Sequence, residues 1–222
     1  MPTSPEELAA DLSGCVELGV TEFHVHPRDA HGRESVRWAA VEAVLAAAPI
    51  QATIGVTTGT WIEPDSAQRL HAISQWTDRL SHASVNLSEP GSIALMRLLI
   101  DHRIGVEAGV WTADDAEVLI RSGLGDQVLR ILVEPVGARV DDALALVAEI
   151  HDVLDAGGAQ APRLQHGDGE ATWLLLDDAV RRGIDTRVGL EDTCLLPDGS
   201  LADGNPALLR AALAMGAGRR RR

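Results

Sequence analysis

The chain has 222 residues, enough to bury the core of one α/β domain. Its composition is 45% hydrophobic, and 33 acidic against 19 basic residues give a net charge of −14, which argues against nucleic acid or a membrane as the main partner. Two cysteines exclude a disulfide framework, and no apolar run approaches the roughly 20 residues of a membrane span, so we expect a cytoplasmic protein.

Helical and strand patterns alternate along the chain, beginning with a helix that is capped at Thr3 or Ser4 and carries Pro5 in its first turn. Such alternation is typical of a parallel sheet with crossover helices. The predicted strands cover 21–27, 50–57, 82–88, 104–110, 128–134, 163–167 and 185–191. The later helices are predicted over about 35–48, 64–77, 91–102, 113–122, 140–156, 171–182 and 204–215. The closing run of arginines is expected to be a solvated tail.

The predicted elements are uneven in number, because a (β/α)₈ barrel has a strand before its first helix and none is predicted here. An upstream start, a gapped barrel, or closure by another segment or subunit would each account for this, and an open doubly wound sheet also accommodates seven strands. We expect a TIM (β/α)₈-type barrel that lacks the first strand, forming a single domain over residues 1–222. Polar residues follow nearly every predicted strand, where barrel enzymes place their sites. Exposed sheet edges would favour a homo-oligomer.

His24 and His26 end the first predicted strand and face the same side of it. Glu191 ends the last predicted strand, which a closed barrel brings next to the first strands. Two imidazoles and one carboxylate with open positions are typical of catalytic Zn²⁺, and other divalent metals also fit. The alternative is a pair of packed histidines and a solvated carboxylate.

Several other polar residues lie at or near strand ends. Asp192 acts either as a base or as a partner that orients Arg187; the alternative is a structural ion pair. The turn of Thr57, Thr58 and Gly59 leaves backbone N–H groups for a carboxylate, or is only a turn.

Asn86 and Glu107 are inward-facing polar residues in apolar strands. A buried Glu107 needs a partner such as Arg187, a metal or a ligand. The roles of Glu134 and His166 remain open; the glycines after His166 could receive a phosphate or merely turn the chain.

Five motifs together resemble the β-keto acid cleavage enzymes, the group of the 3-keto-5-aminohexanoate cleavage enzyme. The resemblance extends over essentially the whole chain from the first helix, and the H-x-H…G-L-E-D order is its most specific part. The motifs are H-V-H-P-R-D at 24–29, V-T-T-G at 56–59, S-V-N-L-S-E at 84–89, V-E-A-G at 106–109 and R-V-G-L-E-D at 187–192.

The resemblance implies a TIM barrel that holds Zn²⁺ through residues matching His24, His26 and Glu191. It also implies an exchange in which a β-keto acid reacts with acetyl-CoA to give acetoacetate and a new acyl-CoA. Arg187 and Asp192 match the family's proton-transfer pair. The chain departs from the family after its strands at 128–134 and 163–167 and is shorter than typical members.

Further roles follow from combining the resemblance with the residues. Thr57, Thr58 and Gly59 would take the substrate carboxylate, with Asn86 nearby, and Glu107 would support the site. Two alternatives remain. One is a metal-dependent hydrolase of the amidohydrolase type, although the middle strands offer Glu107 and Glu134 where that class expects histidines. The other is a metal-binding but inactive homologue.

Overall fold

The computed structural model describes residues 2–218, and these form two compact units, residues 2–108 and residues 109–218. We call them the N-terminal unit and the C-terminal unit. The predicted solvated arginine tail at 219–222 lies outside the described residues. Within residues 2–218, no helix combines the length and apolar character needed to cross a bilayer. A single domain over 1–222 stays a prediction.

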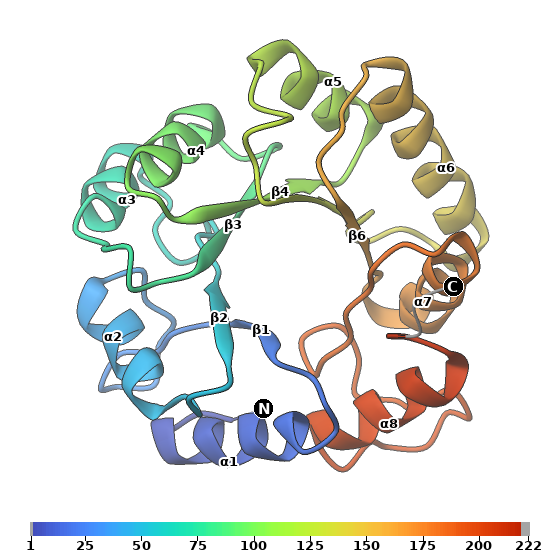
Figure 1. The fold of residues 1–222 in the computed structure, drawn as a ribbon, viewed down its shortest axis with the longest axis horizontal. Helices are drawn as coiled ribbons and strands as arrows, with labels where there is room; N and C mark the ends of the chain where they lie inside the picture. The colour runs from blue at the N-terminus through green and yellow to red at the C-terminus, as the bar shows by residue number, and fades with distance from the viewer. Residues whose placement is uncertain (1, 219–222) are drawn as a thin grey trace. The chain divides into compact units, whose positions relative to one another are not determined.

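The N-terminal unit begins with a helix and then alternates parallel strands with helices (Figure 1). Helices α2, α3 and α4 lie on one side of its strands. The strands follow one another in chain order across the sheet, with Phe23 opposite Ile54 and Gly55 opposite His82. The elements are α1 (Pro5–Val16), β1 (Glu22–Val25), α2 (Trp38–Ala47), β2 (Thr53–Val56), α3 (Ser66–Ile73), β3 (His82–Asn86), α4 (Ser92–Asp101) and β4 (Gly105–Val110), which crosses into the C-terminal unit.

Local sequence explains how these elements start and pack. Ser4 and Glu7 form a capping box at α1, and Pro5 occupies its first turn. Strand β3 is buried over its whole length. Gly55 on β2 lies directly against the ring of the buried His82, so a side chain at position 55 would collide with that imidazole.

The C-terminal unit continues the same alternation, with α5, α6, α7 and α8 each packed on the next. Strands β5 and β6 pair in parallel, and Glu134 N–H donates to the Val110 carbonyl at the end of β4. The elements are α5 (Ala113–Ser122), β5 (Arg130–Val133), α6 (Val140–Ala156), β6 (Arg163–Gln165), α7 (Thr172–Arg182) and α8 (Asn205–Met215), with a 3₁₀ turn at Gly169–Ala171.

The predicted strand at 185–191 is wrong for most of its length. Only Asp185 forms a parallel bridge, with Leu164 of β6. The backbone then turns, because Asp192 N–H and Thr193 N–H both donate to the Gly189 carbonyl. The side-chain oxygen of Asn205 takes the Leu190 N–H that a strand partner would otherwise bind.

The remaining predicted elements are present, most of them with shorter ends. Helices alternate with parallel strands from α1 to α7, which confirms the predicted α/β fold of the TIM-barrel type. As predicted, the first described element is a helix that precedes β1.

Candidate functional site

The two histidines of the H-x-H motif lie together at the end of β1. His24 is within the strand and His26 follows it, and their ring centroids are 5.3 Å apart in a T-shaped arrangement. Both side chains are largely buried. The structure therefore confirms that the period-two spacing brings both imidazoles to one place.

His26 is fixed by a carboxylate and an indole. Its Nδ1 lies 3.2 Å from Glu34 Oε1, and the ring of Trp61 stacks on its imidazole with centroids 6.0 Å apart. Trp61 Nε1 donates to Glu34 Oε2 over 2.7 Å, and Arg28 lies 3.5 Å from Glu34 Oε1. Burial raises the pKa of Glu34, but Trp61, His26 and Arg28 outweigh burial, so its pKa is lowered overall.

His24 faces a second carboxylate in the same unit. Its Nδ1 is 3.7 Å from Glu107 Oε2, which also lies 3.8 Å from His82 Nε2. His82 in turn is 3.9 Å from Glu22. Glu107 is buried, and within the N-terminal unit its carboxylate faces these two imidazoles; the predicted partner, Arg187, a metal or a ligand, stays a prediction.

The chemistry of this cluster fits a bound divalent cation. His24 Nδ1 is buried and makes no hydrogen bond to any described residue. That nitrogen faces Glu107 at 3.7 Å, which leaves Nε2 as the ring atom for an ion. Imidazole is a preferred ligand of Zn²⁺ and similar metals, and a carboxylate on the other ring nitrogen is the usual support for a ligating histidine.

The turn after β2 is buried and tightly hydrogen-bonded. Thr58 Oγ1 donates to the Ser84 carbonyl, and Gly59 N–H donates to Thr57 Oγ1. Thr60 N–H donates to Glu89 Oε1, which also accepts from Asn86 Nδ2. The turn and Asn86 are therefore joined in one network, although its backbone donors at 59 and 60 already have partners. The predicted carboxylate cradle stays a prediction.

A buried ion pair between Arg69 and Glu89 stabilises that network. Arg69 Nη1 lies 3.0 Å from Glu89 Oε2, and Arg69 Nη2 donates to the Pro90 carbonyl. Both side chains are almost fully buried. Glu89 therefore has all of its oxygens occupied by Arg69, Asn86 and Thr60 and acts to hold the turn in place.

In the C-terminal unit, a buried histidine lies between two carboxylates. His166 Nδ1 is 3.3 Å from Asp192 Oδ1, and His166 Nε2 is 3.5 Å from Glu134 Oε2. Arg187 Nη2 is 3.7 Å from the same Asp192 oxygen and 3.3 Å from Glu191 Oε2. The predicted pair of Arg187 and Asp192 is therefore joined by Glu134 and His166, whose roles the sequence leaves open.

His166 is charged at neutral pH. Burial and the charge of Arg187 lower the pKa of His166, but Glu134 and Asp192 outweigh them and raise it to about 9. Burial raises the pKa of Glu134, and His166 and Arg187 lower it by more, so that carboxylate stays ionised. Asp192 is buried with His166 and Arg187 against it, whereas Glu191 is 40% exposed.

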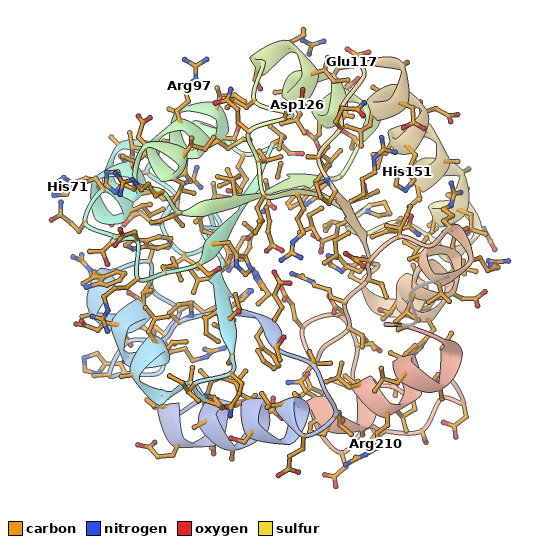
Figure 2. The ribbon with its side chains drawn as sticks, in the orientation of Figure 1. His71, Arg97, Glu117, Asp126, His151 and Arg210 are labelled. Atoms are coloured by element: carbon orange, nitrogen blue, oxygen red, sulfur yellow. The ribbon has the colours of Figure 1, made fainter. Side chains whose placement is uncertain are left out.

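Glu34 and His82 were not among the site residues predicted from the sequence. Glu34 follows the H-x-H motif in an irregular segment where a glutamate is unremarkable, while His82 opens a strand whose apolar pattern signals burial. Of the other histidines, His71 is exposed on α3 and His151 is buried on α6, where it bonds Gln165 of β6 (Figure 2).

The family signature of the beta-keto acid cleavage enzymes matches residues 1–222. The chain belongs to the beta-keto acid cleavage enzyme family. The predicted resemblance is therefore confirmed. Among curated protein sequences, no match was found for this beta-keto acid cleavage enzyme family member.

Solved structures of similar fold include ObcA. Its apo structure matches with a TM-score of 0.76 at 17% identity, over 97% of this chain and 62% of ObcA. A ternary complex of ObcA with a C4-CoA adduct and oxalate matches with a TM-score of 0.74 at 17% identity, over 96% of this chain and 62% of that one. This family member thus spans about three fifths of the ObcA length. At this identity the likeness shows the fold alone.

A mandelate racemase/muconate lactonizing protein from Herpetosiphon aurantiacus is more distant in structure. It matches with a TM-score of 0.51 at 15% identity, over 75% of this chain and 44% of that one. This match likewise concerns the fold of the beta-keto acid cleavage enzyme family member and carries no information on its reaction.

Proposed function

We propose that the protein is a Zn²⁺-dependent acyltransferase that exchanges the acyl groups of a β-keto acid and acetyl-CoA. The products are acetoacetate and a new acyl-CoA. The observation that carries the proposal is the pair of His24 and His26, brought together at the end of β1 with a carboxylate facing Nδ1 of each ring, in a chain of the beta-keto acid cleavage enzyme family.

The metal would be held by His24, His26 and Glu191, with other divalent ions able to take the same ligands. When bound, Zn²⁺ supplies a Lewis acid that stabilises negative charge on a carbonyl oxygen. Glu107 supports His24 from within the N-terminal unit, since its carboxylate faces His24 Nδ1. Glu191 is the most exposed of the proposed ligands, and its Oε2 lies 3.3 Å from Arg187.

Asp192 is the proposed base. It takes a proton from the carbon between the keto and carboxylate groups of the substrate and returns it after the exchange, so that no net proton is consumed. The acetyl group moves from sulfur to that carbon, and the CoA sulfur takes the acyl group that the substrate loses. Arg187 orients Asp192, because its guanidinium lies 3.7 Å from the Asp192 carboxylate.

Thr57, Thr58 and Gly59, with Asn86, are the proposed binding site of the substrate carboxylate. The network through Glu89 keeps this turn rigid, which favours recognition of a small anion. A CoA ester as co-substrate is supported by the fold shared with ObcA, whose ternary complex contains a C4-CoA adduct and oxalate.

We also propose a cytoplasmic homo-oligomer. Neither the buried Cys15 nor the exposed Cys194 forms a disulfide among the described residues, which is consistent with a reducing compartment. Sedimentation of the purified protein should then give a mass of at least two chains.

The proposed reaction is tested with the zinc-loaded protein and a panel of β-keto acids. With acetyl-CoA present, at least one acid should yield acetoacetate and the matching acyl-CoA in equal amounts. Asp192→Asn should bind zinc normally and lose the reaction. If the loaded protein hydrolyses acetyl-CoA or the acid without exchange, a hydrolase replaces the proposal; if nothing reacts, the protein is a metal-binding homologue without this activity.

A further inference from the structure

Glu34 is held by three donors around one carboxylate. His26 Nδ1 and Arg28 Nη2 approach Oε1 at 3.2 and 3.5 Å, and Trp61 Nε1 donates to Oε2 at 2.7 Å. Arg28 is itself fixed by a hydrogen bond to the Gly32 carbonyl, and residues 28 and 34 form an antiparallel bridge. The carboxylate therefore has one defined position, and neither of its oxygens points away from this group.

Trp61 is placed as tightly as Glu34, although its side chain is 55% exposed. Its ring stacks on the His26 imidazole and also covers Gly59, where any side chain would collide with the indole. The indole packs on two groups and donates its only N–H to a carboxylate. These contacts order the ring although it is exposed. Position 59 requires glycine because the indole lies there.

We propose that Glu34 and Trp61 form a positioning pair that fixes the orientation and tautomer of His26. The proposal rests on the proposed role of His26 as a metal ligand. Glu34 accepts the hydrogen bond from Nδ1–H, so Nε2, which carries the lone pair, is the ligand atom. Trp61 acts through Glu34 by holding its second oxygen, and it limits rotation of the imidazole by stacking on its face.

The physical reason for such a pair is the choice between two neutral tautomers. An imidazole with its proton on Nε2 has no lone pair there and must rearrange before it binds a metal. A carboxylate on Nδ1 selects the productive tautomer in advance and makes Nε2 more basic. Because two of the donors to Glu34 come from Arg28 and Trp61, the carboxylate cannot swing to the metal itself without losing both.

The first test is the affinity of the purified apoprotein for Zn²⁺, measured by competition with a chromophoric chelator. Glu34→Gln should weaken zinc binding by about 10–100-fold. Trp61→Phe keeps a stacking ring but removes the N–H donor, so it should weaken binding by a smaller factor. The matched control is Glu42→Gln, because Glu42 pairs with Arg79 on the surface over 2.7 Å and should leave the affinity unchanged.

The double variant tests whether the two residues act together. If Trp61 acts through Glu34, Trp61→Phe should add no loss in the Glu34→Gln background. Equal losses in both backgrounds would overturn the pairing. An unchanged zinc affinity for Glu34→Gln would overturn the role of Glu34.

The second test needs no metal and separates this inference from the proposed function. In ¹⁵N-labelled apoprotein at pH 8, the ring signals that disappear in His26→Ala identify His26. They should show protonated Nδ1 and unprotonated Nε2, and Glu34→Gln should mix the tautomers. A wild-type His26 with its proton on Nε2 overturns the inference whether or not zinc binds. The predicted tautomer in a protein that binds no zinc supports the pair and instead refutes the proposed function.

Discussion

The two units each contain histidines facing carboxylates, and the difference lies in which ring nitrogens the carboxylates face. In the N-terminal unit, Nδ1 of His26 faces Glu34 and Nδ1 of His24 faces Glu107. In the C-terminal unit, both nitrogens of His166 face carboxylates, those of Asp192 and Glu134. An imidazole with one supported nitrogen suits metal binding, whereas one between two carboxylates suits a bound proton.

Proximity of acidic side chains and histidines does not by itself identify a metal site. Glu134, His166 and Asp192 bring ligand atoms within 4.8 Å of one another. The two carboxylates, however, approach opposite nitrogens of the His166 ring. A metal ion shared by all three residues would bind to only one of these nitrogens. The pKa of His166, raised to about 9, agrees with an imidazolium that bridges them. The following experiments test this difference between the two clusters, in order of decreasing expected effect.

The largest effect is expected at the H-x-H motif. His24→Ala removes a proposed ligand, so zinc and the exchange activity should be lost together, to the level of protein without metal. Metal analysis and the acetoacetate assay on the same sample check this. Retained zinc with lost activity would show that His24 acts on the substrate and not on the metal.

Asp192→Asn should separate proton transfer from zinc binding. The amide is the same size but is not a base, so turnover should fall by about 10²–10⁴-fold, the usual contribution of a general acid–base group. Zinc content should stay at the wild-type value. Loss of zinc in this variant would place Asp192 among the ligands.

His166→Asn should destabilise the C-terminal cluster. Removing a buried cation leaves the Asp192 and Glu134 carboxylates with Arg187 but without the imidazolium between them, a loss of about 3–5 kcal/mol in the free energy of unfolding. Urea unfolding near pH 7 measures the effect, and zinc binding should be unchanged. A stability within about 0.5 kcal/mol of wild type would show that His166 is neutral or unimportant to the fold.

The charge on His166 also predicts a pH dependence of stability. Its folded pKa of about 9 lies above the ordinary value of 6.5, so its contribution is complete below about pH 6.5 and is lost as pH rises through about 9. Unfolding free energies at intervals from pH 6.5 to 9.5 should fall more steeply for wild type than for His166→Asn. Parallel profiles would contradict the bridging imidazolium.

Much of the fold followed from periodicity and capping. The helices at 113–122 and 140–156 occur with the predicted bounds, because their first turns carry acidic residues and their apolar faces repeat regularly. The prediction of a strand at 185–191 was wrong for two reasons. The backbone turns after Gly189, and the side chain of Asn205, far along the chain, accepts a hydrogen bond from the Leu190 N–H that a strand partner would otherwise bind. Such a competitor cannot be read from the local sequence.

The candidate site divides in the same way. His24 and His26 were predictable because two residues of one strand share a face by geometry alone. The contacts of Glu34 and Trp61 with His26 were not, since they depend on the path of the irregular segments after β1 and β2. His166 was noticed as a polar residue after a strand, but its charge depends on Glu134 and Asp192, which the sequence does not bring together.

Zinc K-edge X-ray absorption of the zinc-loaded protein tests the central claim most directly, because it counts the imidazoles on the metal. We expect two imidazole ligands in wild type and an unchanged spectrum in His166→Asn. A single imidazole in wild type whose signal disappears in His166→Asn would place the metal between Glu134, His166 and Asp192 and contradict the account.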